Sequence, residues 1–326
     1  MELLDFDYSL PKEFIAQKPV SPRDSSKLMV VNSKIEHKRF YELIDYFKEG
    51  DVLVINETKV IPAKLVGRKE TGSRAEIIVE EFEGKICKGY IKTRNPRIGT
   101  KLIFGKYNAE IIDENKGMFT IRFDENIKSV MRSIGRLPTP PYVKRKLDKD
   151  SQYQTVYSKK KGSIAAPTAG LHFTKRLLDK IRKKGVKIAK VCLHVDFGTF
   201  LPVRDINQSR LHAEYYEVDK KNADIINKRK GRLFAVGTTS VRALESAAKN
   251  EKVIAGKGKT EIFIKPGYRF KNKIDGMITN FHLPKSTLLM LASAFIGRKK
   301  ILDAYKIAVE KKYRFFSFGD AMLILK

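Results

Sequence analysis

The stretch from residue 63 to residue 136 constrains the fold of this chain more than any other feature of the sequence. Short apolar segments alternate here with Gly or Asn at spacings of about 8–12 residues, a pattern typical of an antiparallel sheet or small barrel. The segments are AKLVGRKE, AEIIVEEF, KICKGYIK, TKLIFG, YNAEIIDEN and GMFTIRF, and the proline-rich RLPTPPYV follows them. We therefore predict an all-β, barrel-like domain.

The sequence on either side of this stretch has a different pattern. Apolar strands, such as DVLVINET before it and VKIAKVCLHVDF and RLFAVG after it, alternate with helical segments. Strands that alternate with helices indicate an α/β domain. We predict that residues 1–62 and 140–326 form an α/β main domain, and that residues 63–139 are inserted into it as the β-barrel domain.

The charge of the chain bears on its partners. The 326 residues include 66 Lys and Arg against 37 Asp and Glu, which gives a net charge of +29. Part of the excess is clustered, as in TKRLLDKIRKKGVKIAK at 174–190. Clustered positive charge favours a polyanion such as a nucleic acid as partner, whereas a lysine-rich composition would give only a solvated surface. Charge alone leaves both interpretations open.

Several classes of protein are disfavoured by simple patterns. No apolar run approaches the roughly 20 residues that a membrane-spanning helix needs, so we expect no membrane partner. The N-terminal MELLDFDYSLPKEF is acidic where a signal peptide is basic. Cys87 and Cys192 are far apart and form no CxxC motif, which suits a reducing compartment and argues against a structural zinc site. We expect a cytoplasmic protein.

Two strands carry a histidine and a carboxylate two residues apart. In HVDFGTFLPV, His194 and Asp196 face the same side of a strand that ends near Gly198, and His212 and Glu214 repeat the spacing in HAEYYEV. A metal site, an acid/base pair and a buried polar group are the alternatives. The sequence has no HExxH motif and no Cys cluster, so an acid/base role is favoured over a metal.

Three further segments place polar residues where a strand gives way to a helix. They are AAPTAGLHFT with His172, AVGTTSVRALES with Thr238–Ser240 and Arg242, and TNFHLPKST with Asn280 and His282. A helix start with unpaired N–H groups suits a phosphate or a carboxylate. Ordinary helix capping is the alternative, and the segment AVGTTSVRALES has neither the GxGxxG pattern of a dinucleotide site nor the GK[ST] of a P-loop.

Together with FDYSLPKEFIAQKPVSPRDSSKLMV and TEIFIKPGYRFKNKIDGMITNFHLPKSTLLMLASAFIG, these motifs resemble the S-adenosylmethionine:tRNA ribosyltransferase-isomerases of queuosine biosynthesis, from Asp5 to Gly319. The resemblance implies an α/β fold with an inserted barrel. It also implies transfer and isomerisation of the ribosyl moiety of S-adenosylmethionine onto 7-aminomethyl-7-deazaguanine at the wobble position of tRNA, forming epoxyqueuosine and releasing adenine and methionine. S-adenosylmethionine is then a consumed substrate, and we expect no cofactor, no metal, a tRNA anticodon stem-loop as partner and a monomer.

The resemblance also suggests roles for the candidate residues. We assign proton transfer to His194 oriented by Asp196, with His212 and Glu214 as a second catalytic pair. Thr238, Thr239 and Ser240 would hold the methionine carboxylate with help from Arg242. Asn280 and His282 would hold adenine or the ribose, and Arg23 is a candidate tRNA contact. The remaining predicted substrate-binding residues are Asn56, Thr168, Gly170, His172, Phe173 and Thr199.

Overall fold

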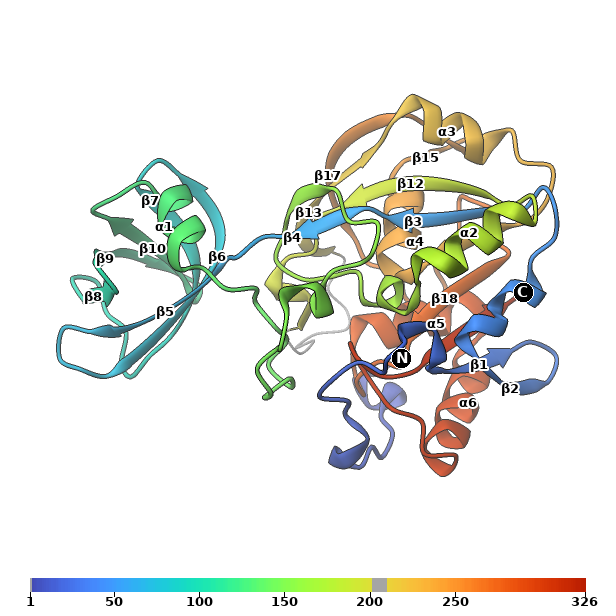
Figure 1. The fold of residues 1–326 in the computed structure, drawn as a ribbon, viewed down its shortest axis with the longest axis horizontal. Helices are drawn as coiled ribbons and strands as arrows, with labels where there is room; N and C mark the ends of the chain where they lie inside the picture. The colour runs from blue at the N-terminus through green and yellow to red at the C-terminus, as the bar shows by residue number, and fades with distance from the viewer. Residues whose placement is uncertain (1, 201–209) are drawn as a thin grey trace. The chain divides into compact units, whose positions relative to one another are not determined.

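The computed structural model describes residues 2–200 and 210–326 (Figure 1). The chain divides into two compact units. The first comprises Met1–Lys59, Pro140–Lys161 and Ala166–Lys326, and the second comprises Val60–Thr139 and Gly162–Ala165. The first unit is an α/β structure and the second contains a closed β-barrel, so the predicted fold class is confirmed.

The first unit contains a nine-stranded mixed sheet. In spatial order its strands are β17 (Gly256–Ile262), β13 (Arg210–Val218), β12 (Lys187–Leu193), β3 (Val52–Asn56), β14 (Leu233–Val236), β18 (Gly276–Asn280), β19 (Ala321–Leu325), β1 (Lys27–Val31) and β2 (Ile35–Arg39).

The centre of this sheet is parallel. Strands β12, β3, β14 and β18 run in one direction, and β19 is antiparallel to β18, with Asn280 opposite Ala321. Every residue of β3, β14 and β18 is buried, as expected for strands covered on both faces. The carboxyl ends of the four parallel strands therefore meet the amino ends of β19 and β1 at one edge, where the strand direction changes. In α/β proteins such an edge is the usual place for a ligand.

Helices pack against this sheet. They are α2 (Lys175–Lys183), α3 (Lys220–Asn227), α4 (Gly237–Ser246), α5 (Thr287–Ile296) and α6 (Arg298–Glu310). Side chains cap two of these helices: Thr174 Oγ1 accepts a hydrogen bond from the amide of Leu177 at the start of α2, and Ser286 Oγ does the same for Leu289 in α5. The apolar face of α2 joins Phe40, Phe173 and strand residues in the core, which leaves its basic face exposed.

Short elements complete the first unit and its connections. The 3-10 helices are η1 (Leu3–Phe6), η2 (Lys12–Phe14), η3 (Arg23–Ser25), η4 (Phe40–Tyr46), η5 (Asp150–Tyr153), η6 (Thr168–His172) and η7 (Phe197–Phe200). The short strands are β4 (Thr58–Val60), β11 (Lys160–Ser163), β15 (Ala248–Lys249) and β16 (Lys252–Val253). No helix within the described ranges has the length and apolar character needed to cross a bilayer.

The second unit is built on a closed barrel. Its strand order is β10 (Met118–Phe123), β7 (Ile86–Lys92), β6 (Arg74–Glu83), β5 (Lys64–Lys69), β8 (Lys101–Phe104) and β9 (Tyr107–Asn115), and β9 pairs back with β10. Alternate residues of β6, such as Ala75, Ile77 and Val79, are fully buried, which is the period-two pattern that the sequence shows. Helix α1 (Ile127–Ile134) follows β10 and is capped by Asn126.

Candidate active site

The predicted site residues come from separate motifs but belong to elements that meet at one edge of the sheet. His194 follows β12, Asn56 ends β3, α4 starts directly after β14, and Asn280 ends β18. Glu214 lies on β13, which pairs with β12 and so runs beside the strand that precedes His194. The order of the parallel strands thus explains how motifs far apart in sequence form a single polar edge.

His194 lies against a polar group and an aromatic ring. Its Nδ1 is hydrogen-bonded to Thr58 Oγ1 at 2.7 Å, and its ring stacks on Tyr215 with centroids 5.3 Å apart. Cys192 Sγ lies 3.6 Å from Nδ1. Burial, together with the positive charge of Lys160, lowers the pKa of His194 below its ordinary value. The imidazole is therefore neutral at neutral pH and able to accept a proton.

Asn56 has a structural role in this arrangement. Its Nδ2 donates to the carbonyl of Leu193 at 2.9 Å, while its Oδ1 accepts from the amides of Leu193 and Thr58, both at 3.1 Å. The side-chain amide thus bridges β3 and β12 where the strands end. It fixes the backbone on both sides of the contact between Thr58 and His194, so Asn56 positions the site through its neighbours.

Glu214 and Arg242 form a buried ion pair. Arg242 Nη1 donates to Glu214 Oε2, and the side chains are only 6% and 3% exposed. Glu214 Oε1 accepts a hydrogen bond from the amide of Asp196 at 3.3 Å, so this carboxylate also holds the segment after His194. Nε and Nη2 of Arg242 are buried and have no hydrogen-bond partner among the described residues. Buried donors without partners are uncommon and point to a ligand or water.

The first turn of α4 offers backbone donors to the same region. Gly237 adopts a φ of +83°, and no side chain in the described ranges caps this helix. Ser240 Oγ donates to the carbonyl of Val236 at 2.7 Å and is thereby occupied within the helix. Thr238 is buried, and Thr239 Oγ1 has no hydrogen-bond partner among the described residues. Of the three predicted hydroxyls, that of Thr239 is thus the best placed for a ligand.

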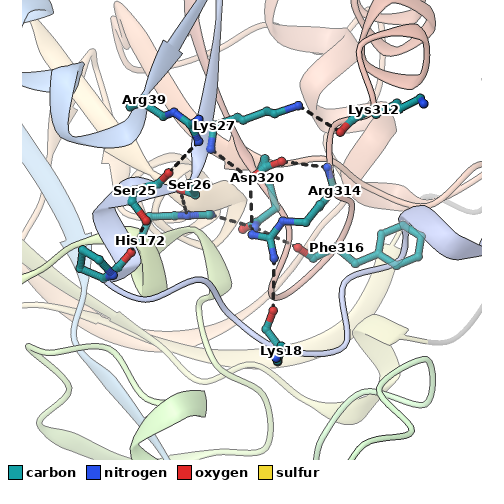
Figure 2. Close-up of polar contacts among 12 residues, drawn as sticks. Lys18, Ser25, Ser26, Lys27, Arg39, His172, Lys312, Arg314, Phe316 and Asp320 are labelled. Carbon is teal, nitrogen blue, oxygen red and sulfur yellow. Dashed lines mark hydrogen bonds and ion pairs between the residues drawn. The ribbon is translucent and has the colours of Figure 1, made fainter.

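His172 is held in one tautomer by Asn280 and by Ser26, and Figure 2 shows the contact with Ser26. Asn280 Nδ2 lies 3.0 Å from the Phe316 carbonyl, an acceptor, and 3.1 Å from His172 Nε2. The amide nitrogen can only donate, so His172 Nε2 accepts and Nδ1 carries the proton toward Ser26 Oγ at 2.8 Å. Burial, with the charges of Arg314 and Arg23, lowers the pKa of His172 to about 3. This histidine is neutral and serves to fix Asn280.

Asp320 anchors the adjoining part of the edge and was not identified by sequence reasoning. Its carboxylate, 2% exposed on the side chain, accepts hydrogen bonds from the amides of Lys27 and Arg314 and from Arg314 Nη2 (Figure 2). These contacts tie the start of β1 to the turn before β19, and so place Ser26 beside His172. A lone aspartate before an apolar strand carries no pattern that would have indicated this role.

The other predicted residues near the edge have mainly structural contacts. His282 Nε2 is hydrogen-bonded to Thr279 Oγ1 at 2.7 Å, and burial lowers its pKa to about 3. Arg23 donates to the carbonyls of Ser151, Gln154 and Leu171. Gly170 lies so close to Tyr157 that a Cβ would be 2.0 Å from its hydroxyl oxygen.

Some predictions are only partly described. Thr168 begins η6, and Phe173, which follows η6, packs edge-on against Phe40 at 5.0 Å. The side chains of Thr199 and His212 lie outside the described residues, so their roles stay predictions. Within the described ranges, no group of three or more His, Cys, Asp or Glu residues is arranged to hold a metal ion.

The chain is similar to known proteins over almost its whole length. The family described as queuosine biosynthesis protein matches residues 3–324. The S-adenosylmethionine:tRNA ribosyltransferase-isomerase of a Thermoanaerobacter species is 50% identical over 346 residues, and that of Desulforamulus reducens is 49% identical over 342 residues; each alignment covers 100% of both proteins. The crystal structure of S-adenosylmethionine tRNA ribosyltransferase from Thermotoga maritima is 38% identical with a TM-score of 0.58, covering 98% of this chain and 100% of that one.

These matches extend over almost the entire chain and include both units. The resemblance inferred from the motifs is thereby confirmed, as is the predicted enzyme class of transferase-isomerase. The chain belongs to the queuosine biosynthesis protein family.

Proposed function

We propose that the chain transfers and isomerises the ribosyl moiety of S-adenosylmethionine onto 7-aminomethyl-7-deazaguanine at the wobble position of tRNA. The products are epoxyqueuosine in the tRNA, adenine and methionine. The names of the relatives support this assignment. The structural observation that carries it is a neutral, half-buried His194 directly after β12, followed by a segment that the buried Arg242–Glu214 pair holds through the amide of Asp196.

In the proposed reaction His194 removes a proton from the ribose carbon next to the sulfonium. Adenine then leaves, the amine of the tRNA base attacks, and closure of the epoxide expels methionine. A neutral imidazole with a lowered pKa is suited to the first step. Because Thr58 is hydrogen-bonded to Nδ1, Nε2 is the nitrogen that would meet the substrate.

Asp196 remains the proposed carboxylate partner of His194. Asp196 is half-buried, and its backbone is held by Glu214. A carboxylate near the reacting centre would favour the positive sulfonium and the imidazolium that forms after proton transfer. We assign the orientation of the ring itself to Thr58, because Thr58 is the residue hydrogen-bonded to Nδ1.

The start of α4 is the proposed site for the methionine carboxylate. The amides of its first turn and the positive end of the helix dipole favour an anion. Asn280 is the proposed contact to adenine or the ribose, because its Oδ1 is buried and has no hydrogen-bond partner among the described residues. We propose that His282, whose Nε2 is engaged by Thr279, supports this strand end.

The proposed macromolecular partner is a tRNA anticodon stem-loop. The excess of positive charge and the exposed basic face of α2 support it, since Lys and Arg contact phosphates when proteins bind RNA. S-adenosylmethionine is treated as a consumed substrate, with no resident cofactor. A monomeric state and a cytoplasmic location remain predictions.

One assay tests the function. The protein is incubated with S-adenosylmethionine and tRNA that carries the deazaguanine precursor, and free adenine is measured. Adenine release that requires the modified base supports the proposal. Tight tRNA binding without adenine release would instead indicate a non-catalytic RNA-binding protein, and loss of activity with chelators would indicate a metal-dependent reaction.

A further inference from the structure

Only one of the three guanidinium nitrogens of Arg242 has a hydrogen-bond partner among the described residues. Nη1 pairs with Glu214, whereas Nε and Nη2 are buried without a hydrogen-bond partner among the described residues. The N–H groups of Nε and Nη2 are parallel and match the two oxygens of a carboxylate. Because the Arg242 side chain is only 6% exposed, Nε and Nη2 have lost their hydrogen bonds to bulk water, and no described residue replaces them. A carboxylate group of a ligand at that edge would pair both donors.

The position of Arg242 on α4 indicates where this ligand lies. Helical side chains lean toward the N-terminus, so the guanidinium extends back over the preceding turn. Thr239, three residues earlier on the same helix face, has a hydroxyl without a partner among the described residues. The first-turn amides from Gly237 onward lie at the same end of the helix. All of these groups suit one negatively charged group of a ligand.

The neighbouring carboxylate restricts the kind of anion. Glu214 and Arg242 together are neutral and both are buried. A simple anion such as phosphate would add uncompensated negative charge beside Glu214 in a site of low dielectric. A zwitterion adds no net charge, and its ammonium can donate to the carboxylate of Glu214 while its carboxylate binds Arg242. The α-amino acid group, with these two charges on one carbon, fits this arrangement.

We propose that Glu214 and Arg242 clamp the α-amino acid end of the substrate as a zwitterion, with the carboxylate on Arg242 Nε and Nη2 and the ammonium on Glu214. This inference rests on the proposed function and extends it. It gives Glu214 a binding role in place of the acid/base role predicted from its spacing to His212. It also predicts that free L-methionine, the product, binds the same clamp.

Calorimetric titration of the full-length protein at pH 7 tests the clamp with three small probes. They are L-methionine, 3-(methylthio)propylamine, which lacks the carboxylate, and 4-(methylthio)butanoate, which lacks the ammonium. We expect L-methionine to bind at least about tenfold more tightly than either analogue, since each lost charged contact costs about 1.4 kcal/mol or more. Equal binding of L-methionine and 4-(methylthio)butanoate, or no binding of L-methionine, would overturn the proposal.

Variants separate the clamp from general loss of structure. Glu214→Gln should reduce the preference for L-methionine over 4-(methylthio)butanoate, a selectivity change that mere destabilisation does not produce. The double variant Glu214→Gln/Arg242→Met removes both charges, avoids an unpaired buried ion and should abolish methionine binding while the protein stays folded. An unchanged preference in Glu214→Gln contradicts the role of Glu214.

Arg232→Met is the matched control. Arg232 also pairs with a buried carboxylate, Asp51, at 3.0 Å, but the pair precedes β14 and β3 and so lies at the opposite ends of these strands. Methionine binding should therefore be unaffected in the Arg232→Met variant. The clamp and the proposed reaction can fail separately: methionine selectivity without adenine release supports the clamp alone, and adenine release without methionine selectivity supports the reaction alone.

Discussion

Thr58 Oγ1 lies 2.7 Å from Nδ1 of His194, although 136 positions separate the two residues in the sequence. Thr58 is fully buried, and its amide is held by Asn56. The contact fixes the orientation of the imidazole and leaves Nε2 for the substrate. His194, which follows β12, is thus positioned by the first residue of β4.

Replacement of His194 by Ala tests its role in proton transfer. We expect the rate of adenine release to fall by about 10²–10⁴-fold, the usual contribution of a general base, while tRNA affinity is retained. Single-turnover assays and tRNA titration measure the two quantities. His37→Ala is the control, because His37 lies on β2 and is hydrogen-bonded to Tyr313. Equal losses of turnover and affinity would exclude the proposed role.

Thr58→Val removes the hydroxyl that contacts His194 and preserves the shape of the side chain. We expect kcat to fall about tenfold, equivalent to about 1.4 kcal/mol, because the ring is no longer held in one orientation. Thr58→Ser keeps the hydroxyl and should restore most of the activity. If Ser and Val variants are equally impaired, the hydroxyl does not orient the imidazole and packing explains the defect.

Lys160 is predicted to set the acidic limb of the pH profile. His194 must be neutral to accept a proton, so activity should fall as the pH decreases through its pKa. Burial and, next, the charge of Lys160 lower this pKa. Lys160→Met removes that charge and leaves Glu217, which acts in the opposite direction, so the limb should move to higher pH. The dependence of kcat/KM on pH measures it, and a shift to lower pH would contradict the assignment.

Two buried histidines should make stability depend on pH. Burial lowers the pKa of both His172 and His282 to about 3, whereas in the unfolded chain each titrates near 6.5. Between these values the unfolded state binds more protons, so the free energy of unfolding decreases as the pH falls below about 6.5 and is unaffected by these groups above it. From pH 7.5 to pH 5.5 each histidine should cost about 1.4 kcal/mol.

Urea unfolding at the two pH values measures this effect. His282→Asn should be less stable at pH 7.5 but show a smaller loss on acidification than the natural protein, because one titrating group is gone. A free energy of unfolding that stays constant between pH 7.5 and 5.5 would mean that these rings are not held neutral.

The fold class could be predicted from the sequence because it depends on patterns among residues close together in the chain. The period of two in segments such as AEIIVEEF and the helix–strand alternation after residue 140 are set by neighbouring residues. The position of the polar motifs at strand ends was also predicted, whereas their meeting at one edge follows from the parallel order of β12, β3, β14 and β18 in the structure. What the sequence could not supply were pairings across the fold.

The pairs at the site show why. His172 meets Asn280 across 108 positions, and Glu214 meets Arg242 across 28. Both arginine and glutamate were identified from their own motifs, yet their mutual contact depends on how α4 lies against β13. Thr58 ends the apolar segment DVLVINET and Asp320 precedes the last strand, and neither belongs to a pattern of charge or spacing that indicates its contact with His194 or with Lys27 and Arg314.

The salt dependence of tRNA binding tests whether the positive charge forms an interface. Phosphate contacts release counterions, so the logarithm of the affinity should fall steeply and linearly with the logarithm of salt concentration, with a slope near −1 for each contact.

Lys180 and Lys183 are exposed on α2. The double variant Lys180→Gln/Lys183→Gln should weaken binding at low salt and reduce the magnitude of the slope by about 1–2. Lys299→Gln/Lys300→Gln on α6 removes the same charge from another helix and serves as the control. If both double variants change the slope equally, the excess charge acts through the net field of the protein and α2 is not a specific contact.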